Sequence, residues 1–418
     1  MNMVNFRQRK FGLIFCFLIL FLGCSGPQIK KTGEASTVDS GEVELQDIVT
    51  STAVIKPRIN VYVENSGSMK GYVKGITDFE SFIYDYLMKV DLDFDNSALN
   101  LNYINSKVEP QSLGLKEFIK NIEPQAFNGG SSDIASMIEM ILNKTVDNDI
   151  SIFISDCIFS PGKGKNADDY LNMQKTEIEY SMSKYLKRCS NGGVLMYQLT
   201  SLYDGYYFNC EDKPQAIKNS RPYYVLVFGK SEKISQLREV VPESKFSIKI
   251  DNVLMMSRGG IDVDYAIVRN SGDFETSRED SKHSIRNLKV NARNNKASFA
   301  INVDFSTLLL DEDYLLSKDN YELKFGKYEI ESVKKCDLEG YTHTIKISSD
   351  FVSSGDMVIK LKRQEIPLWL SEKFTKECDI SAVTMSKTYG LQYLIDGMQN
   401  AFNRTGGNLT EFNIKISN

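Results

Sequence analysis

Residues 59–69 read INVYVENSGSM, and this stretch decides how the rest of the chain is interpreted. Its first part, Ile59 to Val63, is rich in β-branched and aromatic residues and predicts a buried strand. A polar segment with a carboxylate and two hydroxyls follows at once, from Glu64 to Ser68. Ligands of α/β proteins bind at the carboxyl ends of such strands, so this segment is the first candidate for a functional site.

Two later stretches have the same character. Residues 129–134 read GGSSDI and open an amphipathic helix. Residues 150–156 read ISIFISD, a predicted buried strand that is followed by an acid. Carboxyl ends of parallel strands meet at one edge of a sheet, so we expect all three segments to lie together. Hydroxyl and carboxylate oxygens are the ligands that hard divalent cations prefer, and the sequence therefore predicts a cation site.

Strands and helices alternate over residues 57–242, which predicts an α/β domain with a doubly wound, mainly parallel, Rossmann-like sheet. The expected strands are 59–64, 99–104, 150–155, 194–200 and 223–228. The expected helices are 79–90, 115–122, 133–143, 168–186 and 233–240.

The pattern changes after residue 242. Short alternating segments separated by polar turns predict an antiparallel, sandwich-like β domain over residues 243–380. Its expected strands are 246–250, 265–268, 288–291, 297–303, 322–325, 343–347 and 357–361. Residues 381–418 should form a C-terminal helix, over 389–402, and a strand that pack on the body.

The three polar segments resemble the metal-ion-dependent adhesion site of von Willebrand factor A domains. That family's first motif is Asp-x-Ser-x-Ser at the end of the first strand, and Glu64, Ser66 and Ser68 stand at its positions. Its second element is a Thr or Ser that follows a Gly-rich loop and begins a helix. Ser132 matches that element best, with Ser131 as the alternative.

The third element of the family is an Asp at the end of a later strand, usually followed by Gly, and Asp156 matches it. The resemblance implies a divalent cation, Mg²⁺, Ca²⁺ or Mn²⁺, with an open position that a carboxylate of a protein partner fills. The loops expected around it are 70–75, with Tyr72, and 159–164. Two departures stand out: Glu64 lengthens the first ligand by one methylene, and Cys157 replaces the Gly.

Simpler explanations exist for each segment. The serines could cap helices or make turn hydrogen bonds, and Asp156 could be an acidic residue of a loop or a helix N-cap.

Two other functions are also open: a metal-assisted hydrolase of phosphate or sulfate esters with a serine nucleophile, and a metal-free scaffold with a degenerate site. Only two histidines occur, His283 and His343, both outside the three segments, so a histidine-based zinc site or catalytic triad is not indicated.

The N-terminus predicts export. Residues 1–23 combine a basic start with a short apolar stretch, and the ending FLGC, at 21–24, resembles the bacterial lipobox. We therefore expect a signal peptide over 1–23, a lipid-modified Cys24 that anchors the protein to a membrane, and a polar tether over 24–56. This places the protein in the bacterial cell envelope, facing either the periplasm or the outside.

Net charge limits the classes of partner that we expect, and the cysteine content limits the possible disulfides. Residues 1–23 carry three basic and no acidic side chains, so the net charge of −5 becomes −8 in the mature chain. An acidic protein of this kind is a poor nucleic-acid binder. Five of the seven cysteines lie beyond Cys24. Cys189 and Cys210 could form a disulfide after export, or all five could be buried thiols.

Overall fold

The computed structural model describes residues 58–94, 99–146 and 148–418. The expected signal peptide, the lipidation at Cys24 and the tether over 24–56 lie outside these ranges. Within them, the chain is an α/β protein with a seven-stranded mixed sheet, further antiparallel sheets and several helices. None of the helices in this part of the chain has the length and apolar character needed to cross a bilayer.

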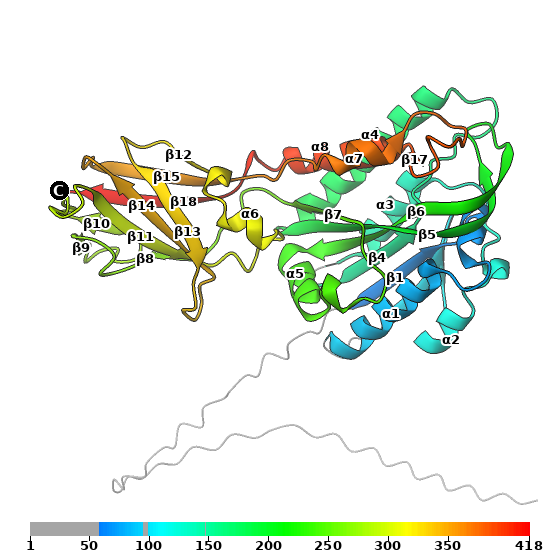
Figure 1. Ribbon diagram of the computed structural model, residues 1–418, viewed down its shortest axis with the longest axis horizontal. Coiled ribbons are helices and arrows are strands. Elements are labelled where there is room, and N and C mark those ends of the chain that lie inside the picture. The colour runs from blue at the N-terminus through cyan, green and yellow to red at the C-terminus, as the bar shows by residue number, and fades with distance from the viewer. Residues whose placement is uncertain (1–57, 95–98, 147) are drawn as a thin grey trace, which may run out of the picture. The chain divides into compact units, whose positions relative to one another are not determined.

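The large sheet has the order β3-β2-β1-β4-β6-β5-β7 (Figure 1). Only β1 pairs in parallel with its neighbours β2 and β4, and every other pair is antiparallel. The expectation of a mainly parallel sheet was therefore wrong. The strands are β1 (Ile59–Glu64), β2 (Leu99–Ile104), β3 (Val108–Pro110), β4 (Ile150–Ser155), β5 (Gly192–Phe208), β6 (Pro214–Lys230) and β7 (Asn252–Ser257).

The antiparallel half of the sheet arises from a long hairpin. Strands β5 and β6 pair along their whole length, from Gly192 with Lys230 to Phe208 with Pro214. The sequence predicted only the apolar parts of these strands, 194–200 and 223–228, and assigned no strand bounds to the polar and aromatic residues between them. Because those residues continue both strands into a hairpin, β6 returns beside β4 in the opposite direction.

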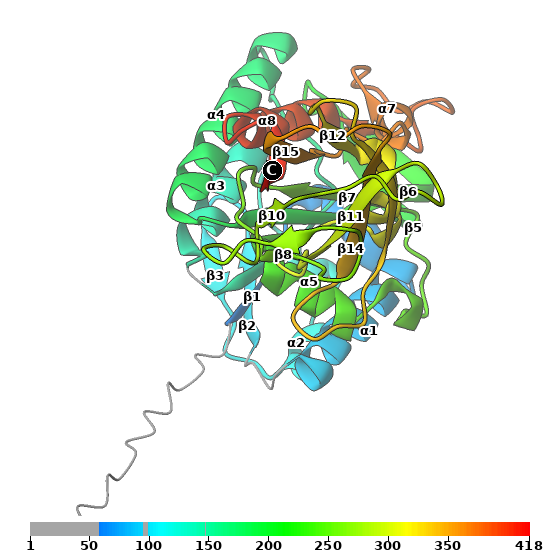
Figure 2. The ribbon, with the colours of Figure 1, turned by 90° about the vertical axis from the view of Figure 1, so that its left-hand side faces the viewer.

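Helices cover both faces of this sheet, as Figure 2 shows. Side chains that alternate along the strands build two separate cores: Val61 and Ile152 belong to one, Tyr62 and Phe153 to the other. The first core packs against α1 (Asp78–Asp93), α2 (Leu115–Lys120) and α5 (Ser231–Val240). The second packs against α3 (Ile134–Lys144), α4 (Ala167–Arg188) and α8 (Leu391–Asn403). Short 3-10 helices are η1 (Gly67–Val73), η2 (Pro124–Ala126) and η3 (Glu243–Lys245).

Residues 265–417 contribute two further sheets that enclose a third core. One has the order β13-β14-β11-β8 and the other β12-β15-β18-β10-β9. All their pairs are antiparallel except β10 with β18. The strands are β8 (Tyr265–Ile267), β9 (Glu275–Thr276), β10 (Ser284–Arg286), β11 (Ala297–Val303), β12 (Tyr321–Leu323), β13 (Glu329–Lys335), β14 (His343–Ser349), β15 (Gly355–Lys362) and β18 (Asn408–Ser417).

Two expected strands are not formed. Residues 246–250 are not a strand, although Phe246, Ile248 and Ile250 alternate, because these side chains pack against the first core from a loop. The strand follows six residues later as β7, so the large sheet extends past residue 242. Residues 288–291 also form no strand. Between β11 and β18 lie α6 (Glu312–Leu316), η4 (Lys318–Asn320), α7 (Trp369–Lys373) and the short pair β16 (Phe374–Thr375) and β17 (Thr388–Tyr389).

Candidate functional site

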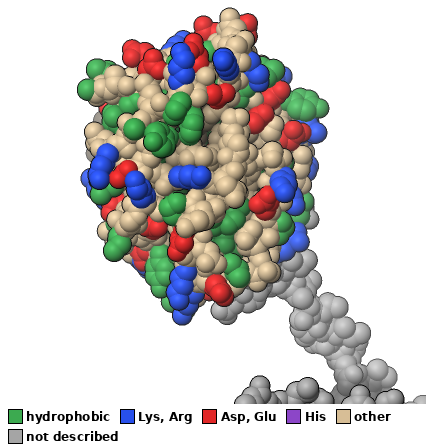
Figure 3. All heavy atoms as spheres, turned by 90° about the vertical axis from the view of Figure 1, so that its right-hand side faces the viewer, with side chains coloured by type: hydrophobic (Ala, Val, Ile, Leu, Met, Phe, Trp, Pro, Cys, Tyr) green, Lys and Arg blue, Asp and Glu red, His purple; other side chains and the backbone are tan. Residues whose placement is uncertain are grey.

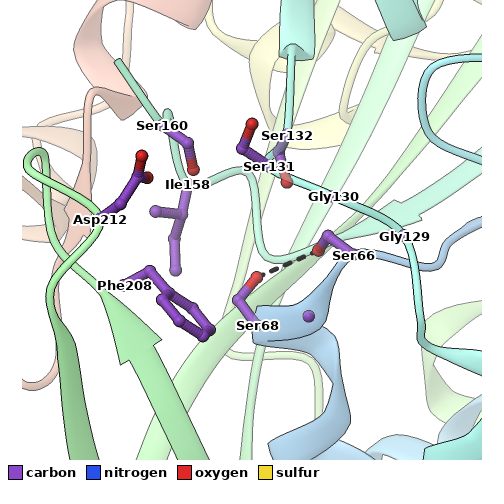
Figure 4. A pocket seen from close by; sticks show the side chains of 11 residues that line it. Ser66, Ser68, Gly129, Gly130, Ser131, Ser132, Ile158, Ser160, Phe208 and Asp212 are labelled. Carbon is purple, nitrogen blue, oxygen red and sulfur yellow. Dashed lines mark hydrogen bonds between the residues drawn. The ribbon is translucent and has the colours of Figure 1, made fainter. Parts of the chain in front are cut away.

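The first two polar segments line one pocket of about 360 Å³ near the carboxyl ends of β1 and β4, and the third segment ends just before the lining residues Ile158 and Ser160. Ser66, Ser68 and Ser132 all line it. In Figure 4 these serines lie across the pocket from Phe208 and Asp212, which come from the end of β5 and the hairpin turn. Ile158 and Ser160, just beyond Asp156, complete that side.

The first two segments are joined through their backbones. The Gly129 amide donates to the carbonyl of Asn65 at 2.9 Å, and Ser66 and Gly129 form an isolated parallel bridge. A Cβ atom at position 129 would lie 2.9 Å from the Asn65 carbonyl oxygen, which leaves room only for glycine. The glycine-rich loop is thus needed to bring Ser132 beside the end of β1.

The serines do not act as helix caps. Ser66 occupies the N-cap position of η1 without a side-chain capping bond, and its Oγ lies 3.1 Å from the Oγ of Ser68. The N-cap of α3 is Asp133, which accepts from the Ser136 amide at 3.0 Å. Ser132 instead points its hydroxyl at Glu64. The capping explanation is therefore wrong for Ser66. The 129–132 loop does end at an N-cap, but the capping residue is Asp133, and the Ser132 hydroxyl bonds Glu64.

Glu64 is fully buried behind the serines. Its two carboxylate oxygens accept hydrogen bonds from the hydroxyls of Ser132 and Ser155. Burial raises the pKa of Glu64, and these hydrogen bonds offset the increase only in part. Ser155 was missed in the sequence as a site residue, although it directly precedes Asp156 on the same strand.

Asp156 is also fully buried. Its Oδ1 accepts from the amide of Ile158 at 3.1 Å, as a turn acid would. Its Oδ2 makes no hydrogen bond of ordinary length and angle within the described ranges, although the Ser68 hydroxyl lies near enough to lower the pKa of Asp156. Burial, and secondly the neighbouring charge of Glu64, raise the pKa of Asp156 to about 7. A buried, unpartnered carboxylate oxygen is costly, which makes it the strongest sign that this site accommodates a further group.

Arg221 contributes positive charge near Asp156, and its charge lowers the pKa of that carboxyl slightly. The side chain is 1% exposed and comes from β6. Its guanidinium lies 5.2 Å from the centre of the Tyr207 ring and donates to the carbonyl of Met385 at 3.2 Å. Nothing in the local sequence around Arg221 indicated this role, because only the folded hairpin brings it near Asp156.

Cys157 follows Asp156 with a backbone φ of 53°. This left-handed conformation suits glycine and costs a residue with a Cβ roughly 1–2 kcal/mol. The thiol is fully buried, and burial raises its pKa well above the ordinary value, so it stays protonated. A cysteine at position 157 therefore holds a backbone conformation that glycine would adopt without strain.

We expect Cys157→Gly to be more stable than Cys157→Ala by about 1 kcal/mol, because both lose the thiol but only glycine relieves the strain. Urea unfolding of the two variants measures the difference. Cys189, also buried but with a φ of −101°, is the matched control: there alanine should be the more stable replacement. If glycine were the more stable replacement at both positions, or alanine at both, the proposed backbone strain at Cys157 would be contradicted.

The loops expected to surround the site behave differently from one another. Residues 67–73 form η1, and Tyr72 is fully buried with its hydroxyl donating to the Pro222 carbonyl, so Tyr72 does not line the pocket as part of a surrounding loop. Residues 159–164 contribute Ser160 to the pocket. The described residues hold no group of three or more His, Cys, Asp and Glu side chains suited to a metal.

Figure 3 views the end of the α/β layers at which the β5–β6 hairpin ends, the right-hand side of Figure 1. Acidic and basic side chains are interspersed there around a strip of polar and backbone atoms.

A scan of the chain against protein-family models and a search of curated proteins found no match.

Proposed function

We propose that this chain is an exported, lipid-anchored binding protein that recognises a protein partner through a divalent cation in a von Willebrand factor A-like domain. The observation that carries the proposal is the unpartnered, buried Oδ2 of Asp156 behind a pocket lined by the hydroxyls of Ser66, Ser68 and Ser132.

The residues present fit a hard cation. Asp156 and Glu64 are two buried acids, and Arg221 alone cannot neutralise both. Ser66, Ser68, Ser132 and Asp156 would hold the cation, and Glu64 would orient Ser132 from behind. Three hydroxyls and one carboxylate make a ligand set of low charge, which leaves positions for water and for a ligand from outside.

The backbone supports the family resemblance. Three parallel strands, β2-β1-β4, lie between helices on both faces, and the motif residues follow β1 and β4. The φ of Cys157 is one that the usual glycine would adopt freely, so the departure at this position leaves the path of the motif intact.

The pocket suits a carboxylate from a partner. When bound, the cation supplies positive charge at the pocket floor, and a carboxylate is its best-matched protein ligand. A volume of about 360 Å³ exceeds what one carboxylate occupies, and Phe208 and Ile158 offer apolar walls to the residue that carries it. Specificity would then depend on those walls.

Export is supported by two independent features. The N-terminal sequence has the order of a lipoprotein signal, ending at Cys24. The folded body also carries a disulfide between Cys210 and Cys378, a bond that persists in oxidising compartments.

Thermal unfolding of the full chain in EDTA, and then with millimolar Mg²⁺, Ca²⁺ or Mn²⁺, tests the cation. A metal at about a hundred times its dissociation constant should stabilise the folded state by about 2.7 kcal/mol, because it binds that state alone. For a protein of this size the midpoint should rise by several degrees. The double variant Ser66→Ala/Ser68→Ala should lose the shift.

Ser160→Ala is the matched control, since Ser160 lines the same pocket but stands outside the proposed ligand set; its shift should equal that of the native protein. If no metal moves the midpoint, the cation-dependent mechanism is wrong and the fold is a metal-free scaffold. A shift that survives loss of both serines would place the cation elsewhere.

A further inference from the structure

The β5–β6 hairpin extends well beyond the sheet. The last pair between β4 and β6 is Ser155 with Tyr224, and the last between β5 and β7 is Gln198 with Asn252. Residues 199–208 and 214–223, which we call the ribbon, therefore pair only with each other. A two-stranded ribbon is at best marginally stable in water, so side contacts must hold it in place.

The end of this ribbon is a wall of the candidate site. Phe208 is the last residue of β5, and Asp212 lies in the turn that follows; both line the pocket opposite Ser66 and Ser68 (Figure 4). The Asp212 carboxylate also accepts from the amide of Lys163 at 3.2 Å. Any movement of the ribbon would thus change the shape of the pocket.

One face of the ribbon is held by residues 374–390, which we call the strap. Cys210, two residues from Phe208, forms a disulfide with Cys378 of the strap. Hydrogen bonds flank it on both strands: Tyr207 hydroxyl to Cys378 carbonyl (2.9 Å), Asn209 amide to Asp379 carboxylate (2.7 Å), and Ile380 amide to Gln215 side chain (2.9 Å).

We propose that the Cys210–Cys378 disulfide is a clasp that positions the Phe208–Asp212 wall, so that the pocket is complete only in the oxidised protein. The base of the ribbon is also held by buried contacts, such as the hydrogen bonds from Arg221 to the Met385 carbonyl and from the Tyr203 hydroxyl to the Ser68 carbonyl. The disulfide is the covalent link at the ribbon end itself, beside Phe208 and Asp212. Cys157, Cys189 and Cys336 are free thiols elsewhere in the described chain, which leaves this as the bond that responds to redox conditions there.

The chemistry is a two-electron exchange. Cys210 and Cys378 thiols each lose one proton and together two electrons to a disulfide donor, which is reduced to two thiols as the Sγ–Sγ bond forms. A dithiol reductant reverses the step. Before export, in a reducing compartment, the wall would be loose; after export the clasp closes and the binding pocket takes its final shape.

Hydrogen exchange of the full chain in EDTA tests the clasp without any metal or partner, so its outcome is independent of the proposed cation. Reducing the native protein with a phosphine under folding conditions should speed exchange of the amides of residues 207–215 by about tenfold or more, because the ribbon end opens locally. Amides of β1, β4 and β14 should exchange as before, and reoxidation should restore protection.

Cys378→Ser should reproduce the reduced protein, and Cys336→Ser, which removes a free thiol, should behave as the native protein. Unchanged exchange of residues 207–215 after reduction would overturn the proposal. Faster exchange everywhere would also overturn it, since the bond would then stabilise the whole fold rather than the wall. Peptide mapping without reductant that fails to find Cys210 linked to Cys378 would do the same.

Discussion

Arg221→Leu is expected to lower the free energy of unfolding at pH 8 by about 3–5 kcal/mol. Arg221 is almost completely buried, its positive charge lowers the pKa of Asp156, and its guanidinium packs on Tyr207. Leucine fills part of the volume but leaves the Asp156 carboxylate without its counter-charge and the Met385 carbonyl without its donor. Chemical denaturation at pH 8 measures the loss.

Lys218→Leu is the matched control on the same strand. Lys218 pairs with Asp204 but is strongly exposed, and its replacement should change stability by less than about 0.5 kcal/mol. Combining Arg221→Leu with Asp156→Asn should cost less than the sum of the two single changes, because the neutral amide no longer needs the guanidinium. Strict additivity would show that Arg221 acts by packing alone.

Raising the pH from 5 to 8 in EDTA is expected to destabilise the native protein relative to Asp156→Asn by about 2–3 kcal/mol. The folded Asp156 keeps its proton up to a pKa of about 7, whereas the unfolded carboxyl loses it near 3.8. Between these values the unfolded state binds fewer protons, so stability falls as the pH rises and levels off above the folded pKa. Unfolding in urea across this range gives the difference directly.

The comparison with Asp156→Asn removes contributions shared by both proteins, such as that of His343, whose pKa is lowered by burial and whose effect has the opposite sign. Asp212→Asn, at an exposed acid of the same pocket, should leave the slope of the native protein unchanged. The difference in unfolding free energy between the native protein and Asp156→Asn should change with pH. If it stays constant, or if the native protein gains stability relative to the variant as the pH rises, Asp156 is not protonated in the folded state.

The local elements of the fold could be read from the sequence because each is specified by its own residues. Strand β4 over 150–155 and strand β11 over 297–303 were confirmed to the residue, and α3 and α4 to within a few residues. Their apolar residues recur at strand or helix spacing and need no distant partner to be recognised. The same logic failed at 246–250, where alternating apolar side chains pack from a loop.

Direction and pairing could not be predicted in this way. The ribbon residues mix polar and aromatic side chains without the apolar alternation of a half-buried strand, because they have no neighbouring strand on either side, and their strand bounds were not predicted. Cys210 was considered as a partner of Cys189, yet Cys189 is a free buried thiol and Cys210 pairs with Cys378, 168 residues away. Such pairings depend on which distant segments the fold brings together, and no local pattern encodes them.

The sequence by itself determined where the candidate site is built: oxygen-bearing side chains placed directly after buried strands, with glycines where two backbones meet. Only the tertiary structure decided what surrounds them. The Ser155 hydroxyl donates to Glu64 because β4 pairs in parallel with β1. Arg221 comes near Asp156, and Phe208 and Asp212 line the pocket, because the β5–β6 hairpin extends to the carboxyl ends of β1 and β4. Strand formation is local, whereas the burial that raises the pKa of Asp156 and leaves its Oδ2 without a partner arises when distant segments pack.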